Sequence, residues 1–289
     1  MLIRPHELLT NAMDSDFAIG AFNTSNLEIT QAIVAAAAAQ SSPVIVQTSE
    51  GAIEYAGLKV LTQIVKTIAE ECEVPVVLHL DHGKSPAVVK RCIEAGYGSV
   101  MIDASRESFE DNISMTREVV AYAHERGVWV EAELGAILGA EGMKNLKEDR
   151  TPDEMLTDPS QAEQFVEETR VDALAVSVGT MHGAFTGKEY IRFELVEKLG
   201  HLLMRVPLVL HGASGITAEH LQKVARSNVC KVNIDTEMRI AFEGAVKAYF
   251  SQGHKGYDPR KIIGPAREAV QRVVEEKIKI LGSADRVRV

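Results

Sequence analysis

The sequence predicts a (β/α)8 TIM barrel, and three observations support that fold. Short runs rich in Val, Ile, Leu and Ala recur eight times, with helical patterns between them. Near-continuous apolar runs are typical of strands covered on both faces, as in a parallel sheet with crossover helices. Eight such strands in 289 residues fit a closed barrel. A doubly wound open sheet is the alternative, but no glycine-rich phosphate fingerprint follows the first run.

The expected strands follow one another along the whole chain, which we treat as a single domain over 1–289 with an additional C-terminal helical segment. In chain order the strands are expected at 18–24, 43–49, 75–82, 99–105, 129–135, 172–179, 207–214 and 229–236. Helical patterns between them lie at 58–72, 85–96, 109–127 and 218–228.

Composition and charge restrict the class of protein. Hydrophobic residues make up 46% of the chain and charged residues 25%, as in soluble globular proteins. The start of the chain lacks the apolar run of a signal peptide, and the three cysteines form no CxxC pair, so we expect reduced thiols in the cytoplasm. The formal net charge of -10 argues against nucleic acid as a partner. It allows an anionic small substrate, because a site can carry local positive charge.

Histidines and carboxylates gather at the expected carboxyl ends of strands, where a barrel builds its active site. His82, His182 and His211 follow the third, sixth and seventh strands. Glu131 and Glu133 share a face of the fifth strand, where uncompensated carboxylates would be costly. A divalent cation removes that cost, and three histidines with one open position are typical of catalytic zinc. The sequence therefore predicts a metal site at this rim.

Two glycine-rich segments follow the sixth and seventh strands. GTMHGAFTGK (179–188) and HGASG (211–215) are loops in which backbone can approach a ligand closely. With the segment NIDT (233–236), they fall where barrels often bind phosphate. Tight turns alone are the simpler explanation of these glycines. A metal beside a phosphate site, however, indicates a Lewis acid that polarises a carbonyl of a sugar phosphate.

Nine motifs extend this pattern over essentially the whole chain. They are GAFN (20–23), SEGA (49–52), LDHG (80–83), SVMIDAS (99–105), VEAELG (130–135), GTMHGAF (179–185), LHGASGI (210–216), KVNIDTEMRIAF (231–242) and YDPRKIIGPAREAV (257–270). In this order they resemble the class II, zinc-dependent ketose-bisphosphate aldolases. So many motifs in one order are highly specific for that family.

The resemblance implies roles for the catalytic and metal-binding residues. Asp81 resembles the family's acid/base, and Glu141 resembles a second base on a long loop between the fifth and sixth strands. The implied metal ligands are His82, His182 and His211, with Glu133 able to bind or lie beside the ion. One catalytic Zn²⁺ per subunit is implied, and a second metal position or a monovalent cation is left open.

The resemblance also implies a set of substrate contacts. Gly183, Ser214 and Thr236 resemble residues near the first phosphate. Arg239 and Arg260 resemble cations for the far phosphate, one of them donated by a neighbouring subunit of a homodimer or larger homo-oligomer. The full implied set is Asn23, Ser49, Gly183, Gly212, Ala213, Ser214, Asn233, Ile234, Asp235, Thr236, Arg239 and Arg260.

The implied reaction is the reversible aldol cleavage of fructose 1,6-bisphosphate to dihydroxyacetone phosphate and glyceraldehyde 3-phosphate, a step of glycolysis and gluconeogenesis. Cleavage would proceed through a zinc-stabilised enediolate, so the enzyme would be a lyase. The partner would be a small sugar bisphosphate, with no nucleic acid and no membrane. Asp235 resembles the fructose enzymes, whereas a tagatose 1,6-bisphosphate aldolase of the same family is the alternative.

Three further readings compete with a metal-dependent aldolase. A Schiff-base aldolase needs a reactive lysine, but the sixth strand contains none, and Lys231 is expected to form an interior ion pair. A metal-dependent barrel hydrolase usually has an HxH pair on an early strand, which the first strand lacks. A non-catalytic sugar-phosphate sensor would be expected to have lost Asp81 or one of the histidines.

Overall fold

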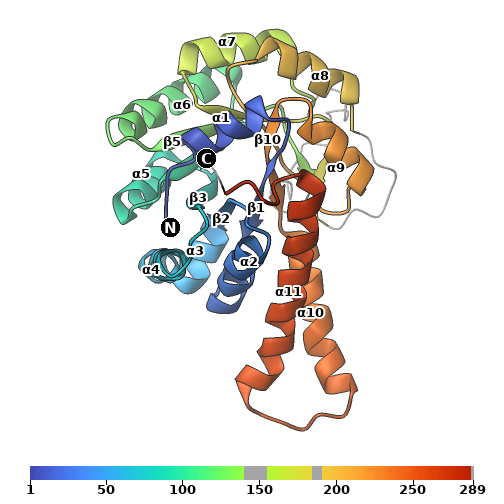
Figure 1. The fold of residues 1–289 in the computed structure, drawn as a ribbon. Helices are drawn as coiled ribbons and strands as arrows, with labels where there is room; N and C mark the ends of the chain where they lie inside the picture. The colour runs from blue at the N-terminus through green and yellow to red at the C-terminus, as the bar shows by residue number, and fades with distance from the viewer. Residues whose placement is uncertain (140–154, 184–190, 288–289) are drawn as a thin grey trace.

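The computed structural model describes residues 1–139, 155–183 and 191–287, and its centre is a closed barrel of parallel strands (Figure 1). The barrel strands are β1 (Ile19–Asn23), β2 (Val44–Ser49), β3 (Val76–Gly83), β4 (Ser99–Ile102), β5 (Trp129–Leu134), β7 (Ala173–Val176), β9 (Leu208–Leu210) and β10 (Val229–Ile234). They follow one another around the barrel in chain order, and β10 closes against β1. The predicted (β/α)8 architecture is confirmed.

Each predicted strand range holds one barrel strand, and β3 extends one residue beyond its range, to Gly83. Ala21 of β1 pairs with Ile45 on one side and with Asn233 of β10 on the other, which fixes the register at the closure. The carboxyl ends of all eight strands therefore meet at one rim, as the sequence argument requires.

Helices pack around the strands, and the first of them packs against the barrel interior. They are α1 (His6–Asp14), α2 (Leu27–Ala39), α3 (Glu50–Ala56), α4 (Leu58–Glu70), α5 (Pro86–Ala95), α6 (Phe109–His124), α7 (Pro159–Thr169), α8 (Phe193–Leu202), α9 (Ala218–Ala225), α10 (Thr236–Ser251) and α11 (Pro259–Leu281). Their ends have local causes. In α5, the Ser85 hydroxyl accepts a hydrogen bond from the Val88 N–H, and Gly96 ends the helix in a left-handed conformation.

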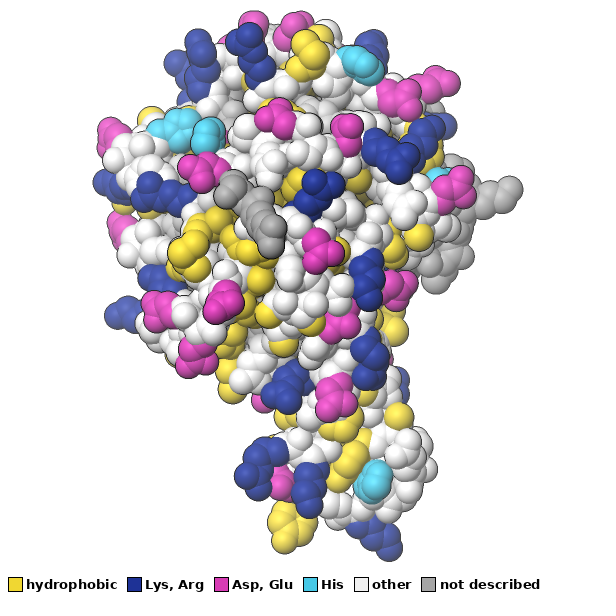
Figure 2. All heavy atoms as spheres, in the orientation of Figure 1, with side chains coloured by type: hydrophobic (Ala, Val, Ile, Leu, Met, Phe, Trp, Pro, Cys, Tyr) yellow, Lys and Arg dark blue, Asp and Glu magenta, His cyan; other side chains and the backbone are white. Residues whose placement is uncertain are grey.

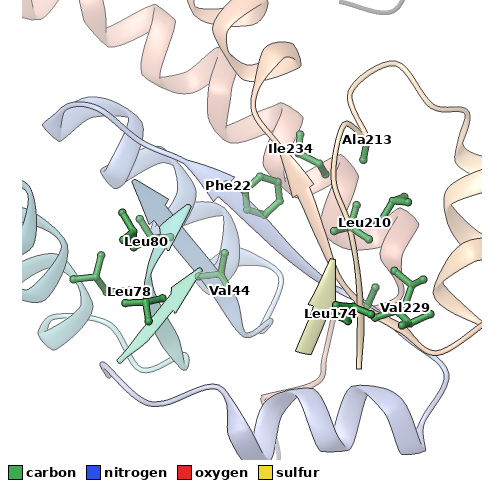
Figure 3. Packing of buried hydrophobic residues seen from close by; sticks show 14 of the residues in the cluster. Phe22, Val44, Leu78, Leu80, Leu174, Leu210, Ala213, Val229 and Ile234 are labelled. Carbon is green, nitrogen blue, oxygen red and sulfur yellow. The ribbon is translucent and has the colours of Figure 1, made fainter. Parts of the chain in front are cut away.

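Two hydrophobic clusters stabilise the barrel, one outside the strands and one inside them. The outer cluster joins alternate strand residues such as Phe22, Leu80 and Leu210 to the helices (Figure 3). The inner cluster holds residues of the opposite strand face, such as Ile45 and Val77, together with apolar side chains of α1. This alternation follows from the two-residue period of a strand, and it leaves the inner faces near the carboxyl ends for polar side chains.

Two features stand apart from the barrel itself. Helices α10 and α11 form a hairpin that projects away from it (Figure 1), and on this projection hydrophobic side chains lie among lysines and arginines (Figure 2). Ile240, Phe250 and Tyr257 of this region are 53%, 52% and 95% exposed. Above the barrel, β6 (Leu138–Gly139) pairs in parallel with β8 (Met181–His182). Of the helices that the structure describes, none is long and apolar enough to cross a membrane.

Candidate active site

A narrow cleft of about 80 Å³ at the carboxyl ends of the strands holds most of the predicted site residues. Its walls come from the ends of β1, β3 and β10, from β8, from the loop after β9 and from the start of α10. The lining residues are Asn23, Asp81, His82, His182, Gly183, His211, Gly212, Ser214, Asn233, Asp235, Thr236 and Arg239. All of them belong to the set expected from the sequence.

Three histidine rings from distant parts of the chain meet in this cleft. The ring centroids of His82 and His211 are 4.7 Å apart, and those of His82 and His182 are 5.1 Å apart. One nitrogen of each ring lies within 4.8 Å of one nitrogen of both others, so the three rings could hold one metal ion. The expected convergence of the three histidines is found.

Carboxylates orient two of these rings. The Nδ1–H of His82 donates to Asp103 Oδ2 at 2.8 Å, and the Nε2–H of His211 donates to Glu131 Oε1 at 2.9 Å. The two remaining nitrogens, His82 Nε2 and His211 Nδ1, face each other at 3.0 Å. Nitrogen ligands around a tetrahedral zinc ion lie about 3.3 Å apart, and their other ring nitrogens usually bind a carboxylate or carbonyl. The arrangement of these two rings fits that of metal ligands.

The backbone at the end of β3 is bent to present His82. The register between β3 and β4 shifts between Leu80 and Gly83, and His82 lies in the left-handed region at φ 48°. A left-handed conformation for a residue with a side chain costs about 1–3 kcal/mol and is common at functional sites. A side chain at position 83 would lie 2.6 Å from the Met101 carbonyl oxygen, so only glycine permits this bulge.

Gly212 allows the segment that carries His182 to approach the loop that carries His211. It has φ 64°, and a Cβ atom there would lie 2.5 Å from the Met181 carbonyl oxygen. The backbone of β8 therefore passes directly against the loop after β9, and His182 is held beside His211 by this close approach. The sequence placed His182 in the loop after the sixth strand, whereas the structure places it on the short strand β8.

The buried carboxylates of β5 have different partners. Glu131 is 0% exposed, and its Oε2 lies 2.8 Å from the Nζ of Lys231, so the ion pair expected for this lysine is confirmed. Glu131 is thus compensated, contrary to the expectation that both β5 carboxylates lack a counter-charge. Glu133 Oε2 has no hydrogen-bond partner among the described residues and lies 4.0 Å from His82 Nδ1. An orphaned carboxylate oxygen beside the histidines fits a bound cation.

The charges of the cleft shift the pKa of several groups. Burial would lower the pKa of the His82 ring, but the neighbouring carboxylates of Asp81, Asp103 and Glu133 outweigh burial and raise the pKa to about 10. Burial, together with the charge of Asp103, raises the pKa of Glu133 to about 8. Burial and the nearby His82 ring lower the pKa of His182 to about 4. The negative charges that favour a proton on the His82 ring would also favour a metal cation beside it.

Asp81 is held by two amides beside the histidines. The residue is 2% exposed; Asn23 Nδ2 donates to Oδ2 at 2.8 Å, and Asn233 Nδ2 donates to Oδ1 at 3.2 Å. Burial would raise the pKa of this carboxyl group, but the charges of His82 and other nearby cations outweigh burial and lower it. Asp81 therefore faces the cleft as a fixed carboxylate.

Comparison with known proteins decides the family. The family model described as "Fructose-bisphosphate aldolase class-II" matches residues 3–286. The chain belongs to the class-II fructose-bisphosphate aldolase family. Two relatives named fructose-bisphosphate aldolase come from Geobacillus stearothermophilus, at 43% identity over 288 residues, and from Staphylococcus aureus, at 40% over 291 residues. The first alignment covers 98% of each chain and the second 99% of each.

Solved structures agree with this family. The X-ray structure of the YdjI aldolase from Escherichia coli K12 superimposes with a TM-score of 0.87 at 33% identity and covers 100% of both chains. A fructose-bisphosphate aldolase from Campylobacter jejuni shares the fold, with a TM-score of 0.83 at 22% identity over 98% of this chain and 96% of that one. Aldolases are lyases, so the prediction of a lyase is confirmed, and class-II aldolases are metal-dependent.

Some residues expected to act in this aldolase lie at the edge of the cleft or outside it. A neighbouring hollow of about 540 Å³ is lined by Ser49, Asp235 and Arg239, among others. Ser49 also caps α3 through the Ala52 N–H, and Arg239 forms a two-bond ion pair with Asp235 at 2.8 Å and 2.6 Å. Their side chains thus have structural contacts as well as a place in the lining of this hollow.

Four further residues expected at the aldolase site contribute no described side chain to the cleft lining. The side chains of Ala213 and Ile234 pack in the outer hydrophobic cluster, so these residues could meet a ligand only through backbone atoms. Arg260 is 89% exposed, lies at the start of α11 and forms an ion pair with Asp258. Glu141 lies outside the described residues.

Asp103 is the site residue that the sequence analysis left without a role. It directly follows β4 in the motif SVMIDAS, accepts a hydrogen bond from His82 and is itself fixed by the Ser105 hydroxyl at 2.7 Å. With His82 and Glu133 it forms a second group that could hold a metal ion. Its position directly after a barrel strand could have identified it, because polar residues at the carboxyl end of every other strand were assigned to the site.

Proposed function

We propose that this aldolase cleaves fructose 1,6-bisphosphate reversibly to dihydroxyacetone phosphate and glyceraldehyde 3-phosphate, with one zinc ion per subunit. The observation that carries the proposal is the pair of facing nitrogens, His82 Nε2 and His211 Nδ1, whose rings are each anchored by a carboxylate. Such anchoring is the usual arrangement of histidines that bind a catalytic metal.

His82, His182 and His211 would hold the zinc ion, with Glu133 beside them. Three protein ligands leave a position open for substrate, as in other catalytic zinc sites. Zinc bound there supplies Lewis-acid chemistry, which polarises a substrate carbonyl. Glu133 Oε2, which lacks a hydrogen-bond partner among the described residues, would meet the ion.

Asp81 would accept the proton of the substrate C4 hydroxyl when the C3–C4 bond breaks. Asn23 and Asn233 hold its two oxygens, so the carboxylate needs little reorganisation to act. In the reverse direction the same carboxyl group returns the proton. Glu141, which lies outside the described residues, is proposed on the family resemblance as the group that exchanges the second proton.

The phosphate groups would be bound at the cleft walls. Gly183 and Gly212 have positive φ angles and offer backbone without a side chain, and Ser214 offers a hydroxyl. Thr236 begins α10, and a helix N-terminus favours an anion. Arg239, which is 60% exposed and also lines the cleft, would meet the far phosphate.

We place fructose before tagatose as the sugar because Asp235 lines the cleft where it can approach the substrate hydroxyls. We also propose a homodimer or larger homo-oligomer, in which the exposed hairpin of α10 and α11 meets a second copy and Arg260 reaches its active site. A cytoplasmic location fits the free thiols of Cys72, Cys92 and Cys230.

The proposed function is tested by assaying the purified protein with both sugar bisphosphates, before and after treatment with EDTA and again after zinc is returned. Fast cleavage of fructose 1,6-bisphosphate that is lost to EDTA and restored by zinc is the expected result. Preference for tagatose 1,6-bisphosphate would overturn the assignment of the sugar. Activity that EDTA does not reduce would overturn the proposed metal site, and binding of the sugar bisphosphate without cleavage would indicate a sensor.

A further inference from the structure

A buried polar cluster lies inside the barrel beneath the cleft, and the proposed function uses only one of its members, Glu131, which anchors the ring of His211. It consists of His79, Ser99, Glu131 and Lys231, whose side chains are at most 1% exposed. Burying a lysine and a glutamate is costly, and a hydrophobic pair of similar volume is often no less stable. A structural role alone therefore does not explain why charges occupy this position.

The strand neighbours of the Lys231–Glu131 ion pair make a charged pair at this position unexpected. Lys231 pairs in the sheet with Ile19 and Val209, while Glu131 pairs with Met101 and Ala173. These four neighbours are apolar members of the inner hydrophobic cluster. The charged pair thus sits between an apolar barrel floor and the polar cleft.

The contacts of the cluster form one continuous chain that ends at a proposed metal ligand. His79 Nδ1 lies 2.6 Å from Ser99 Oγ, and its Nε2 faces the Lys231 ammonium at 3.5 Å. The ammonium lies 2.8 Å from Glu131 Oε2. The other oxygen of Glu131 accepts the Nε2–H of His211, whose Nδ1 faces the cleft.

We propose that Lys231 is a positioning residue for the metal centre: it fixes Glu131, which holds the His211 ring with Nδ1 turned toward the ion. This inference rests on the proposed function. Because Lys231 occupies the second oxygen of Glu131, the first oxygen accepts the hydrogen bond of the His211 Nε2–H in a single ring orientation. Loss of the ammonium frees the carboxylate to rotate, and the direction of His211 is no longer fixed.

The role of the lysine is distinct from that of a Schiff-base lysine. Its ammonium is occupied by Glu131 and His79 and lies under the histidines instead of facing open space in the cleft. Lys231 is absent from the residues that line the cleft. Lys231 would therefore affect the reaction only indirectly, by fixing the orientation of the His211 ring.

The test is a double-mutant cycle read out as zinc affinity, measured by competition with a chromogenic chelator. We expect Lys231→Met to weaken zinc binding by about 10–100-fold, the usual effect of losing a partner of a metal ligand. Glu131→Leu removes the link between the lysine and the His211 ring, and in that background the added Lys231→Met should change the zinc affinity by less than about threefold. Additive effects, or full zinc affinity in Lys231→Met, would overturn the proposal.

Lys277→Met is the matched control. Lys277 is also a buried lysine, 5% exposed, and its Nζ binds Glu237 at 2.8 Å, with no hydrogen bond or ion pair to the three histidines among the described contacts. This variant should lose stability while keeping the zinc affinity of the wild type. An equal loss of zinc affinity in both lysine variants would mean that general loosening of the fold explains the effect.

Neutron diffraction from zinc-loaded wild-type crystals tests the proposal without any variant that must fold. The expected result is a deuteron on Nε2 of His211 and three on Nζ of Lys231 directed to its two acceptors and one other group. A deuteron on Nδ1 of His211 would overturn the inference. If the wild type binds no zinc, the proposed function fails first, so the two failures are distinguishable.

Discussion

The ring of His82 is fixed by a single carboxylate, because its Nδ1–H donates to Asp103 Oδ2 at 2.8 Å. This contact determines that Nε2 is the nitrogen facing His211. The orientation of one proposed metal ligand thus depends on a residue that directly follows another strand, β4.

Removing that carboxylate should weaken the metal site. We expect Asp103→Ala to reduce zinc affinity by about 10–100-fold, because the His82 ring loses the acceptor that orients it. Equilibrium competition with a chelator measures the change. Glu107→Ala, which removes an exposed carboxylate from the same loop, is the control and should bind zinc as the wild type does. Equal affinities of the two variants would contradict the role of Asp103.

Asp81→Asn should separate catalysis from binding. The amide keeps the shape of the side chain but cannot accept a proton, so kcat is expected to fall by about 10²–10⁴-fold. Zinc content, measured by metal analysis, should stay near one ion per subunit, because Asp81 holds no histidine ring. A variant whose KM rises while kcat is unchanged would show that Asp81 only binds substrate.

Gly212→Ala should disturb the contact between β8 and the loop after β9. The new methyl group would lie 2.5 Å from the Met181 carbonyl oxygen at a position with φ 64°, so we expect lower thermal stability and weaker zinc binding. Gly244→Ala in α10, where a Cβ meets nothing within 4 Å, is the control. There alanine should match or raise the melting temperature, because it favours the helix. Unchanged zinc binding in Gly212→Ala would indicate that His182 reaches the metal independently of this contact.

Asp158 should make α7 sensitive to acid. It caps the helix through the N–H groups of Ser160 and Gln161, and the Ser160 hydroxyl and these N–H groups lower its pKa. Since the folded pKa lies below the unfolded one, its stabilisation is present above about pH 4 and is lost as the pH falls further. Asp158→Ala should cost about 1 kcal/mol at pH 7 by urea unfolding, with a smaller difference at pH 3. Asp158→Asn keeps a cap that does not titrate, so a loss at pH 7 as large as that of Asp158→Ala would contradict this account.

The exposed apolar surface of the hairpin should mediate self-association. We expect Ile240→Asp to shift the protein toward the monomer in sedimentation analysis, because a charge in an apolar interface is costly to desolvate. Val60→Asp on α4, where the residue is 54% exposed, is a control of equal exposure on the barrel. If both variants sediment like the wild type, the hairpin is not the contact between subunits.

The barrel could be predicted because each strand carries its own signal. A run such as PVVLHLDH is apolar where it is covered on both faces and becomes polar at the rim, so both the strand and its functional end can be read locally. Asp81 and His82 were located in this way. The inner ion pair of Lys231 was also predictable, since a charge within an apolar strand needs a partner.

Other features depend on contacts between distant segments and leave no local pattern. The pairing of β6 with β8 involves two residues on each side, too few for a periodicity to show. The partner of Lys231 was not identified, because Glu131 lies 100 positions away and was expected to need a metal ion instead. Likewise, the hydrogen bond of Asp103 to His82 requires knowledge of the bulge that turns the histidine.

Closure of the barrel also has a consequence for how the protein is made. The two amides that hold Asp81 come from Asn23 and Asn233, which lie on the first and last barrel strands. During synthesis the carboxylate gains its second donor only when β10 has emerged and paired with β1. Until then β1 and β9 are open edges, and such long-range pairing is slow. The proposed acid/base, Asp81, is therefore among the last parts of the molecule to be assembled, and a chain cut before β10 would expose strand edges that invite aggregation.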